Sequence, residues 1–329
     1  MFQRFTNYLK HPQTCIPFLL ITMTLIYGAF FPLQKLFCLH VHPMEAAVLR
    51  QLGFGVIILI GGWFWGFWQR DWKQLPPHWP WFVFCGLLGV FYMQITAALA
   101  VPMTTSFHAT LMMGTIPLQT AIINNLLGYE KLSTRAMLGI TLGMAGVAWL
   151  VLEQLGVQGD VRSTGTNPLV GNVLILINAF IFSVYTIAVR RLVQHHSPVR
   201  ILSFNFLQAG LYMLLLLGVA SSTWLPPTVA STLPTFASTW QALTHLDALS
   251  WWLLMYMVVF AGFVGYLIHH LSLKYVTSNK VVTYHFVQPV LAAGLGHWWF
   301  NEPFTLPMAC AAVLVLAGVV TASKAPVKN

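Results

Sequence analysis

Charged residues are scarce in this chain. Asp, Glu, Lys and Arg make up 7% of its 329 residues, whereas a soluble domain carries roughly 25%. So few charges cannot cover a surface that faces water, which excludes an ordinary soluble enzyme or binding domain. The hydrophobic share is 57% and the mean hydropathy is +0.73. The composition therefore predicts an integral membrane protein.

Cysteine is also scarce, and the four cysteines show no paired spacing: Cys15, Cys38, Cys85 and Cys310. They are scattered in or beside apolar runs, so we interpret them as packing residues and expect neither a disulfide framework nor a metal site. The sequence has no GxxxxGK(S/T) phosphate-binding loop, which argues against direct ATP-driven pumping. No cofactor is expected.

Long apolar runs are abundant. A helix needs about 20 apolar residues to cross the hydrocarbon core of a bilayer, and runs without apolar/polar alternation satisfy their backbone as helices rather than as a closed barrel. Ten such runs occur, at residues 16–34, 45–66, 80–100, 103–125, 135–152, 169–190, 199–220, 249–272, 279–299 and 304–322. The predicted fold class is all-α integral membrane, with ten transmembrane helices.

The basic residues fall mostly on one predicted side of the membrane. With a cytoplasmic N-terminus, the outer side receives only Lys35, Arg50 and Arg162. The inner side receives Arg4, Lys10, Arg70, Lys73, Lys131, Arg135, Arg190, Arg191, Arg200, Lys274, Lys280, Lys324 and Lys328. This asymmetry predicts that both termini are cytoplasmic in a multi-pass protein of the cell membrane, such as a bacterial inner membrane. It also favours membrane lipid over nucleic acid as the partner of a chain with net charge +9.

An internal repeat relates the two parts of the chain. The corresponding residues, all at one offset, are Pro117 with Pro289, Glu130 with Glu302, and Gly146 with Gly318. Each part holds five apolar runs, and an odd number of helices makes the second copy enter the membrane from the opposite side. Inverted repeats of this kind are a recurrent architecture of secondary transporters, whose substrate site lies near the midplane between the halves.

The repeat predicts the domain organisation. The expected segments are a cytoplasmic N-terminal segment at 1–15, a first repeat at 16–152, an external linker at 153–168, a second repeat at 169–322 and a cytoplasmic tail at 323–329. Residues 221–248, rich in Pro, Ser and Thr, read as an external surface loop inserted into the second repeat.

Several motifs carry a family resemblance over nearly the whole chain. They include "IYGAFFPLQK", "HPMEAAVLR", "GLLGVFYMQITAALAVPMTTS", "PLQTAIINNLLGYEKLS" and "GITLGMAGVAWLV" in the first part, and "LSLKYVTSNKVV", "QPVLAAGLGHWWFNEPFT" and "LAGVVTA" in the second. With these motifs the chain resembles the EamA domains of the drug/metabolite transporter superfamily, which are ten-helix carriers with a five-plus-five inverted build. The resemblance implies a secondary transporter, and it leaves the substrate open.

The repeated spacing does not by itself show that these residues form a functional site. We interpret Glu130 and Glu302 mainly as helix-terminal charges, beside the plausible N-cap residues Ser133 and Thr305. Pro117 and Pro289 are expected to bend their helices, and the bends serve either packing or the shaping of a cavity.

Polar residues deep inside the apolar runs are the candidates for a substrate site. His108, Met112, Thr115 and Gln119 recur at helical spacing on one face, where the alternative role of Thr and Gln is hydrogen bonding between packed helices. The residues expected to bind substrate are Tyr27, Gln34, Tyr92, His108, Met112, Thr115, Asn178, Tyr185, Tyr266, His269, His285 and Gln288. Of the adjacent pair His269 and His270, at most one can face a cavity.

The remaining charges set the predicted substrate class. Lys35 and Arg50 lie near predicted helix ends and are expected to reach the outer surface, and Glu45 is a possible partner of either. No carboxylate falls unambiguously at the midplane. A strongly cationic drug would need one, so a neutral or zwitterionic metabolite fits better.

The function predicted from the sequence is therefore alternating-access transport, with export as the favoured direction, of a small neutral or zwitterionic metabolite such as an amino acid. The protein is expected to be a monomer or homodimer. One alternative is an importer of a nucleobase-like or choline-like solute, which an aromatic cage could hold. Another is a histidine-dependent membrane enzyme, since the chain has twelve histidines. Its "HVH" and two "HH" pairs lack the clustered HxxHH spacing of such enzymes.

Overall fold

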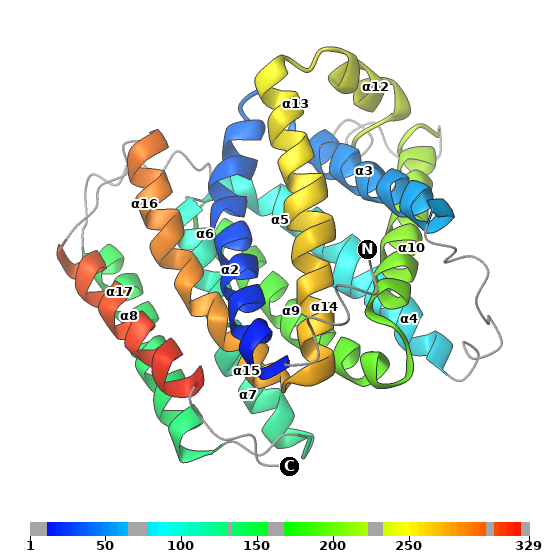
Figure 1. Ribbon diagram of the computed structural model, residues 1–329. Coiled ribbons are helices and arrows are strands. Elements are labelled where there is room, and N and C mark those ends of the chain that lie inside the picture. The colour runs from blue at the N-terminus through cyan, green and yellow to red at the C-terminus, as the bar shows by residue number, and fades with distance from the viewer. Residues whose placement is uncertain are drawn as a thin grey trace.

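The structure is a computed structural model of the chain. It describes residues 12–64, 78–104, 106–129, 133–156, 168–222, 233–300 and 306–323. Within these ranges all regular structure is helical, and the helices form one bundle (Figure 1).

Each of the ten apolar runs corresponds to a described helix or to a row of successive helical segments. In the first part these are α2 (Pro12–Phe37), α3 (Pro43–Phe64), the row α4 (Trp79–Gly86), η4 (Leu87–Tyr92), α5 (Met93–Ala100) and η5 (Val101–Met103), then α6 (Ser106–Met113), α7 (Ile116–Leu126) and α8 (Thr134–Gly156). In the second part these are α9 (Pro168–His195), α10 (Pro198–Ala220), the row α13 (Ala248–Met255), η6 (Tyr256–Gly265) and α14 (Tyr266–Tyr275), then α15 (Ser278–Thr283), η7 (Tyr284–Val287), α16 (Gln288–Phe300) and α17 (Leu306–Ser323).

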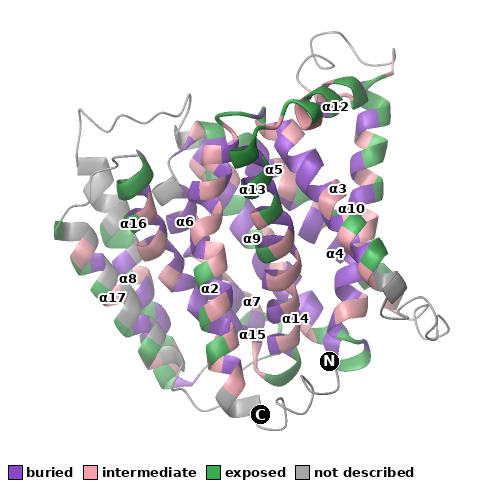
Figure 2. Ribbon diagram, turned by 45° about the horizontal axis from the view of Figure 1, so that its top comes forward, coloured by how far each residue is buried: buried purple, intermediate pink, exposed green. Residues whose placement is uncertain are grey.

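Six helical stretches of the described chain are long and apolar enough to cross a membrane: Cys15–Phe37, Pro43–Gly61, Trp79–Met103, Val170–His195, Pro198–Ala220 and Ala248–Tyr275. Their outward faces are apolar too. On α2, for example, Phe18, Ile21 and Leu25 are exposed on the outside of the bundle. Figure 2 shows buried residues along the inside of the bundle and exposed ones on its periphery. An apolar periphery of this extent suits contact with lipid rather than water.

Two helices are interrupted just before Pro117 and Pro289, the prolines that the sequence pairs at one offset. The turn Gly114–Thr115 separates α6 from α7, and the 3₁₀ segment η7 separates α15 from α16. Pro117 and Pro289 each occupy the second position of the helix that follows, so their missing N–H groups fall where a helix has no internal acceptor for them. Before Pro117 the expected bend is thus a turn between two helices, and before Pro289 it is a short 3₁₀ segment between two α-helices.

Two further helices contain π-helical segments, which sequence periodicity does not reveal. In η4, Gly89 leaves room for the Tyr185 ring of α9, and in η6, Gly262 leaves room for the Phe54 ring of α3. A side chain at either glycine would occupy the space of the ring. The π-segments thus allow aromatic rings from neighbouring helices to lie directly on a helix backbone, and such segments are frequent near functional sites.

α8 and α17 lie side by side at one edge of the bundle (Figure 1). Their backbones approach closely, because a Cβ atom at Gly318 would lie 2.6 Å from the Gly139 carbonyl oxygen and 2.6 Å from the Gly143 nitrogen. Ser133 begins α8 as expected, since its Oγ accepts a hydrogen bond of 3.2 Å from the Ala136 N–H. Glu130, Glu302 and Thr305 lie outside the described residues.

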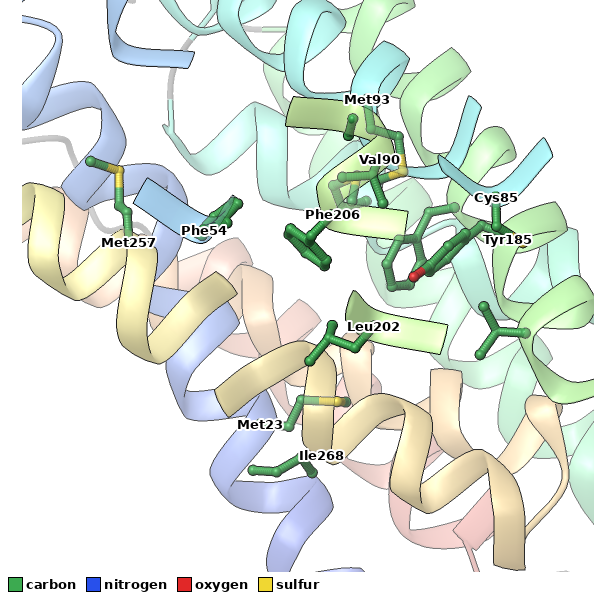
Figure 3. Packing of buried hydrophobic residues seen from close by; sticks show 14 of the residues in the cluster. Met23, Phe54, Cys85, Val90, Met93, Tyr185, Leu202, Phe206, Met257 and Ile268 are labelled. Atoms are coloured by element: carbon green, nitrogen blue, oxygen red, sulfur yellow. The ribbon is translucent and has the colours of Figure 1, made fainter. Parts of the chain in front are cut away.

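The C-terminal half of α9 is mostly buried inside the bundle, and the helix packs on α5, α6, α7 and α14. The core around it draws side chains from widely separated helices, and Figure 3 shows Phe54, Met93, Phe206 and Met257 among them. Of these, Phe54, Met93 and Met257 also line the candidate site.

The insertion at 221–248 is not all irregular loop, which corrects the expectation from composition. It contains α12 (Phe236–Thr244). A capping box begins this helix: the Ser238 N–H donates to Thr235 Oγ1 at 3.1 Å, and the Thr235 N–H donates to Ser238 Oγ at 3.0 Å. Clusters of Ser and Thr are typical of loops, but at this spacing they begin a helix.

Candidate functional site

A cavity of about 80 Å³ lies inside the bundle between segments from both parts of the chain. This volume accommodates several water molecules. The lining residues are Tyr27, Phe30, Phe31, Arg50, Phe54, Met93, Gln94, Ala97, Met113, Asn178, Phe182, Met257, Ala261, Gly262, Tyr266, His285 and Gln288. Most of this wall is apolar or aromatic, with a few polar groups, as is usual for small-molecule sites.

Arg50 is the charged residue of the cavity wall, and its position corrects the sequence-based prediction. The side chain is only 1% exposed and does not reach the outer surface. Its Nη2 donates to Gln94 Oε1, its Nη1 lies 4.0 Å from Met257 Sδ, and its guanidinium stands 4.9 Å from the centroid of the Phe30 ring. Arg50 lies on the second turn of α3, where α5 and η6 pack against the helix and close the path to the surface.

Glu45 does not pair with Arg50. Its Oε2 lies 2.6 Å from His42 Nδ1, at the start of α3. None of the described residues that line the cavity is Asp or Glu. In the described part of the chain, the Arg50 guanidinium therefore contacts neutral groups only.

A second set of polar side chains lies where α2 meets η7 and the start of α16. The rings of Tyr27 and His285 stack with centroids 5.9 Å apart, and Gln288 Nε2 lies 2.7 Å from His285 Nδ1. Within the described structure, Tyr27 Oη and His285 Nε2 are buried without a hydrogen-bond partner. Two polar atoms in that state are available to a ligand or to water.

Asn178 and Tyr266 brace the cavity. Asn178 Nδ2 donates to the Met93 carbonyl oxygen at 2.9 Å and to Thr96 Oγ1 at 2.8 Å, which ties α9 to α5. The Tyr266 ring packs edge-to-face against Tyr27 at 6.0 Å and Phe206 at 5.0 Å. Both residues hold neighbouring helices in register around the cavity.

Five of the twelve residues expected from the sequence line this cavity: Tyr27, Asn178, Tyr266, His285 and Gln288. Two others form a buried polar layer behind it. The Tyr185 hydroxyl lies 2.7 Å from His270 Nε2, and His269 Nε2 lies 3.2 Å from Thr186 Oγ1. His269 and His270 are both fully buried, and neither lines the cavity.

The other five expected residues are placed elsewhere. Thr115 Oγ1 donates to the Met112 carbonyl oxygen at 2.7 Å and accepts from Gln119 Nε2 at 2.9 Å. Thr115 and Gln119 therefore form hydrogen bonds with each other and with the end of α6, not with the cavity. Met112 is packed against the hydrophobic core. Gln34 is buried outside the cavity wall, and Tyr92 is 37% exposed. The side chain of His108 lies outside the described residues.

Sequence reasoning missed Arg50, Gln94 and the aromatic wall of Phe30, Phe31 and Phe54. The distance of Arg50 from the start of α3 could have indicated its burial, because seven residues along a helix correspond to about 10 Å of depth. The phenylalanines carried no such signal, since lipid-facing and cavity-facing rings look alike in the sequence. Among the described residues, no three His, Cys, Asp or Glu side chains are placed to share a metal ion.

Together, the apolar bundle and its internal cavity define a multi-pass membrane protein with a potential solute site. The family model of the EamA-like transporter family matches residues 15–152 and 169–324, so the chain belongs to this family. It is similar to an uncharacterized transporter of Archaeoglobus fulgidus, 22% identical over 307 residues that cover 92% of this chain and 95% of the relative. It is also similar to the uncharacterized transporter YyaM of Bacillus subtilis, 23% identical over 317 residues covering 96% and 95%.

A solved crystal structure shares the fold. It aligns with a TM-score of 0.65 and 18% identity, over 94% of this chain and 96% of the other. Family and relatives agree that the protein is a membrane transporter.

Proposed function

We propose that the protein is a secondary transporter in which two five-helix halves rearrange around the cavity. The observation that carries this proposal is the position of the cavity, whose lining residues come from both proposed halves. The two matched segments of the family model, 15–152 and 169–324, have nearly the bounds of these halves. Interrupted helices at equivalent positions of two repeats are a feature of the substrate sites of such carriers.

The wall of the cavity supports a carrier rather than an open channel, because it is built of side chains from both proposed halves. Passage of a solute then requires the two halves to move relative to one another. We propose that this movement is the alternating-access step, and that it opens the cavity to one side of the membrane at a time.

The proposed substrate is a small metabolite with an apolar or aromatic part, such as an amino acid, and the proposed direction is export. Support for the apolar part comes from Phe30, Phe54 and Phe182 in the cavity wall. The buried Arg50 disfavours the choline-like solute considered from the sequence, because two cations in one cavity repel each other.

Flux measurements in reconstituted vesicles test the proposal. Purified protein is screened with a metabolite library for thermal stabilisation, and the stabilising compound is then used as a radiolabelled substrate. A carrier gives saturable uptake that is accelerated by unlabelled substrate on the opposite side. Uptake that rises linearly with concentration and shows no exchange would contradict alternating access.

A further inference from the structure

We propose that Arg50 is the anchor for a carboxylate group of the transported solute. The proposal rests on the proposed transport function and narrows its substrate class to organic acids. Amino acids are included through their carboxylate, while neutral amides and cationic solutes are excluded.

The first argument is the burial of a permanent charge. Arginine stays protonated in proteins, and a buried cation is unfavourable unless an anion or several hydrogen bonds compensate it. Arg50 is 1% exposed. Of its five N–H donors, one bonds to the neutral Gln94 oxygen, and Nε is buried without a partner. The guanidinium thus keeps donor capacity inside a cavity.

The second argument is that no described acidic side chain acts as a counter-ion of Arg50. The described acidic side chains are engaged elsewhere: Glu45 pairs with His42, and Asp247 accepts the Ser250 N–H at 2.9 Å as the N-cap of α13. The contacts of the guanidinium with Phe30 and Met257 are weak attractions that leave its charge unneutralised. An incoming carboxylate would supply the missing charge and can bind the planar guanidinium with two parallel hydrogen bonds.

The third argument is the chemistry of the rest of the wall. Phe30, Phe54 and Phe182 offer apolar contact, and Tyr27 Oη and His285 Nε2 offer hydrogen bonds without a fixed charge. Among the described residues, no Asp or Glu lines the cavity to receive an ammonium group. The walls therefore fit an acid with an apolar body and one further polar group, and an α-amino group is not required.

Matched acids and amides test this specificity in purified, detergent-solubilised protein. The probes are 3-phenylpropionate with 3-phenylpropanamide, isovalerate with isovaleramide, and L-phenylalanine as the zwitterion. We expect at least one acid to raise the melting temperature of the wild-type protein, and its amide to have no effect. If no acid stabilises the protein more than its amide does, the proposal is wrong.

Substitution of the anchor tests the assignment to Arg50. R50M should weaken the apparent affinity for the stabilising acid by about 30-fold or more, because a buried charge-assisted pair is lost. R50K should lie between R50M and the wild type, since it keeps the charge without the planar fork. R135Q is the matched control, because Arg135 is an exposed arginine at the start of α8. An acid response that persists unchanged in R50M would overturn the assignment.

Stability without ligand separates an anchor from a structural residue. If the buried charge of Arg50 has no counter-ion until a ligand binds, it destabilises the ligand-free protein. R50M removes this charge and should raise the melting temperature of the ligand-free protein by about 2 °C or more. The double variant R50M/Q94L also removes the acceptor that R50M leaves without its donor, and it should be at least as stable as R50M. A fall in the melting temperature of both variants would show that Arg50 supports the fold, and would overturn the proposal.

The binding and flux measurements distinguish failure of the carboxylate site from failure of the transport function. Binding of an acid that depends on Arg50, without counterflow in vesicles, would support the anion site and contradict the transport function. Saturable counterflow of a neutral amide that is equal in the wild type and R50M would support transport and overturn the anion site.

Discussion

At the scale of the residue, the interior of the bundle is held by neutral polar pairs. Tyr185 bonds to His270 across α9 and α14, and Asn205 Nδ2 lies 3.5 Å from the same hydroxyl. These groups are remote from water, so a lost partner leaves a polar atom unsatisfied. Polar pairs of this kind fix which faces of the helices meet, a task that non-directional apolar contacts perform poorly.

The Tyr185 hydroxyl should therefore contribute measurably to stability. Y185F leaves His270 Nε2 without its partner, and we expect a loss of about 1–3 kcal/mol in the free energy of unfolding. The measurement is thermal or denaturant unfolding in detergent. Y275F is the control, because Tyr275 is exposed at the end of α14. Equal stability of the two variants would show that the hydrogen bond contributes nothing.

His196 gives the protein a pH dependence outside its membrane-spanning helices. Burial, together with His78, Arg200 and His195, lowers the pKa of His196 from 6.5 to about 4. The unfolded chain therefore binds the proton more readily than the folded chain. This contribution to stability is fully present above pH 6.5 and is lost as the pH falls towards 4.

H196N should flatten that pH dependence. The melting temperature of the wild type is expected to fall between pH 6.5 and pH 4, and that of H196N to fall less. H245Q serves as the control, since His245 is exposed in the turn after α12. A fall in H196N as steep as in the wild type would assign the effect to other groups.

The sequence indicated five of the polar residues that line the cavity, but it missed Gln94 and placed Arg50 at the surface. Polar residues inside an apolar run are unusual enough to be noticed, and five of those named line the cavity. Arg50 was expected to reach the surface because a long side chain near a helix end usually does. Whether it can do so depends on the neighbouring helices, which periodicity within one helix does not reveal.

At the scale of the element, the existence of the helices followed from run length and their interruptions from proline. The starts of α7 and α16 are 172 residues apart, at positions 116 and 288, as are those of α8 and α17, at positions 134 and 306. The π-segments η4 and η6 could not be anticipated, because each forms where a ring from another helix lies on a glycine.

The close contact of α8 with α17 depends on Gly318. A methyl group there would meet the backbone of Gly139 and Gly143, which cannot move aside as a flexible side chain would. G318A should therefore lower the free energy of unfolding by about 1–3 kcal/mol.

G294A is the matched control for this contact. Gly294 is also in a helix, but nothing lies within 4 Å of the position that a Cβ would take. Alanine there should be neutral or stabilising, because it is the better helix former by about 1 kcal/mol. If both variants lose the same stability, the close approach of α8 and α17 is not the cause.

At the scale of the whole molecule, the distribution of charge and apolar surface sets the orientation. Trp79, Trp251, Trp252 and Trp298 are exposed near the ends of their helices, where aromatic side chains commonly mark the membrane interface. The asymmetry of Lys and Arg predicts which of the two ends faces the cytoplasm. Apolar packing is the same whichever way the bundle is inserted, so the basic residues decide the predicted orientation.

Cysteine labelling in intact cells tests the orientation with two described positions. On a background without the four native cysteines, W240C lies in α12 of the proposed external insertion and R135C lies at the start of α8 on the proposed cytoplasmic side. Both side chains are exposed. An impermeant maleimide added outside should label W240C at once and R135C only after the cells are permeabilised. The opposite pattern would mean that the bundle is inserted the other way round, and labelling of both from outside would place α8 and α12 on one side and contradict the ten-helix topology.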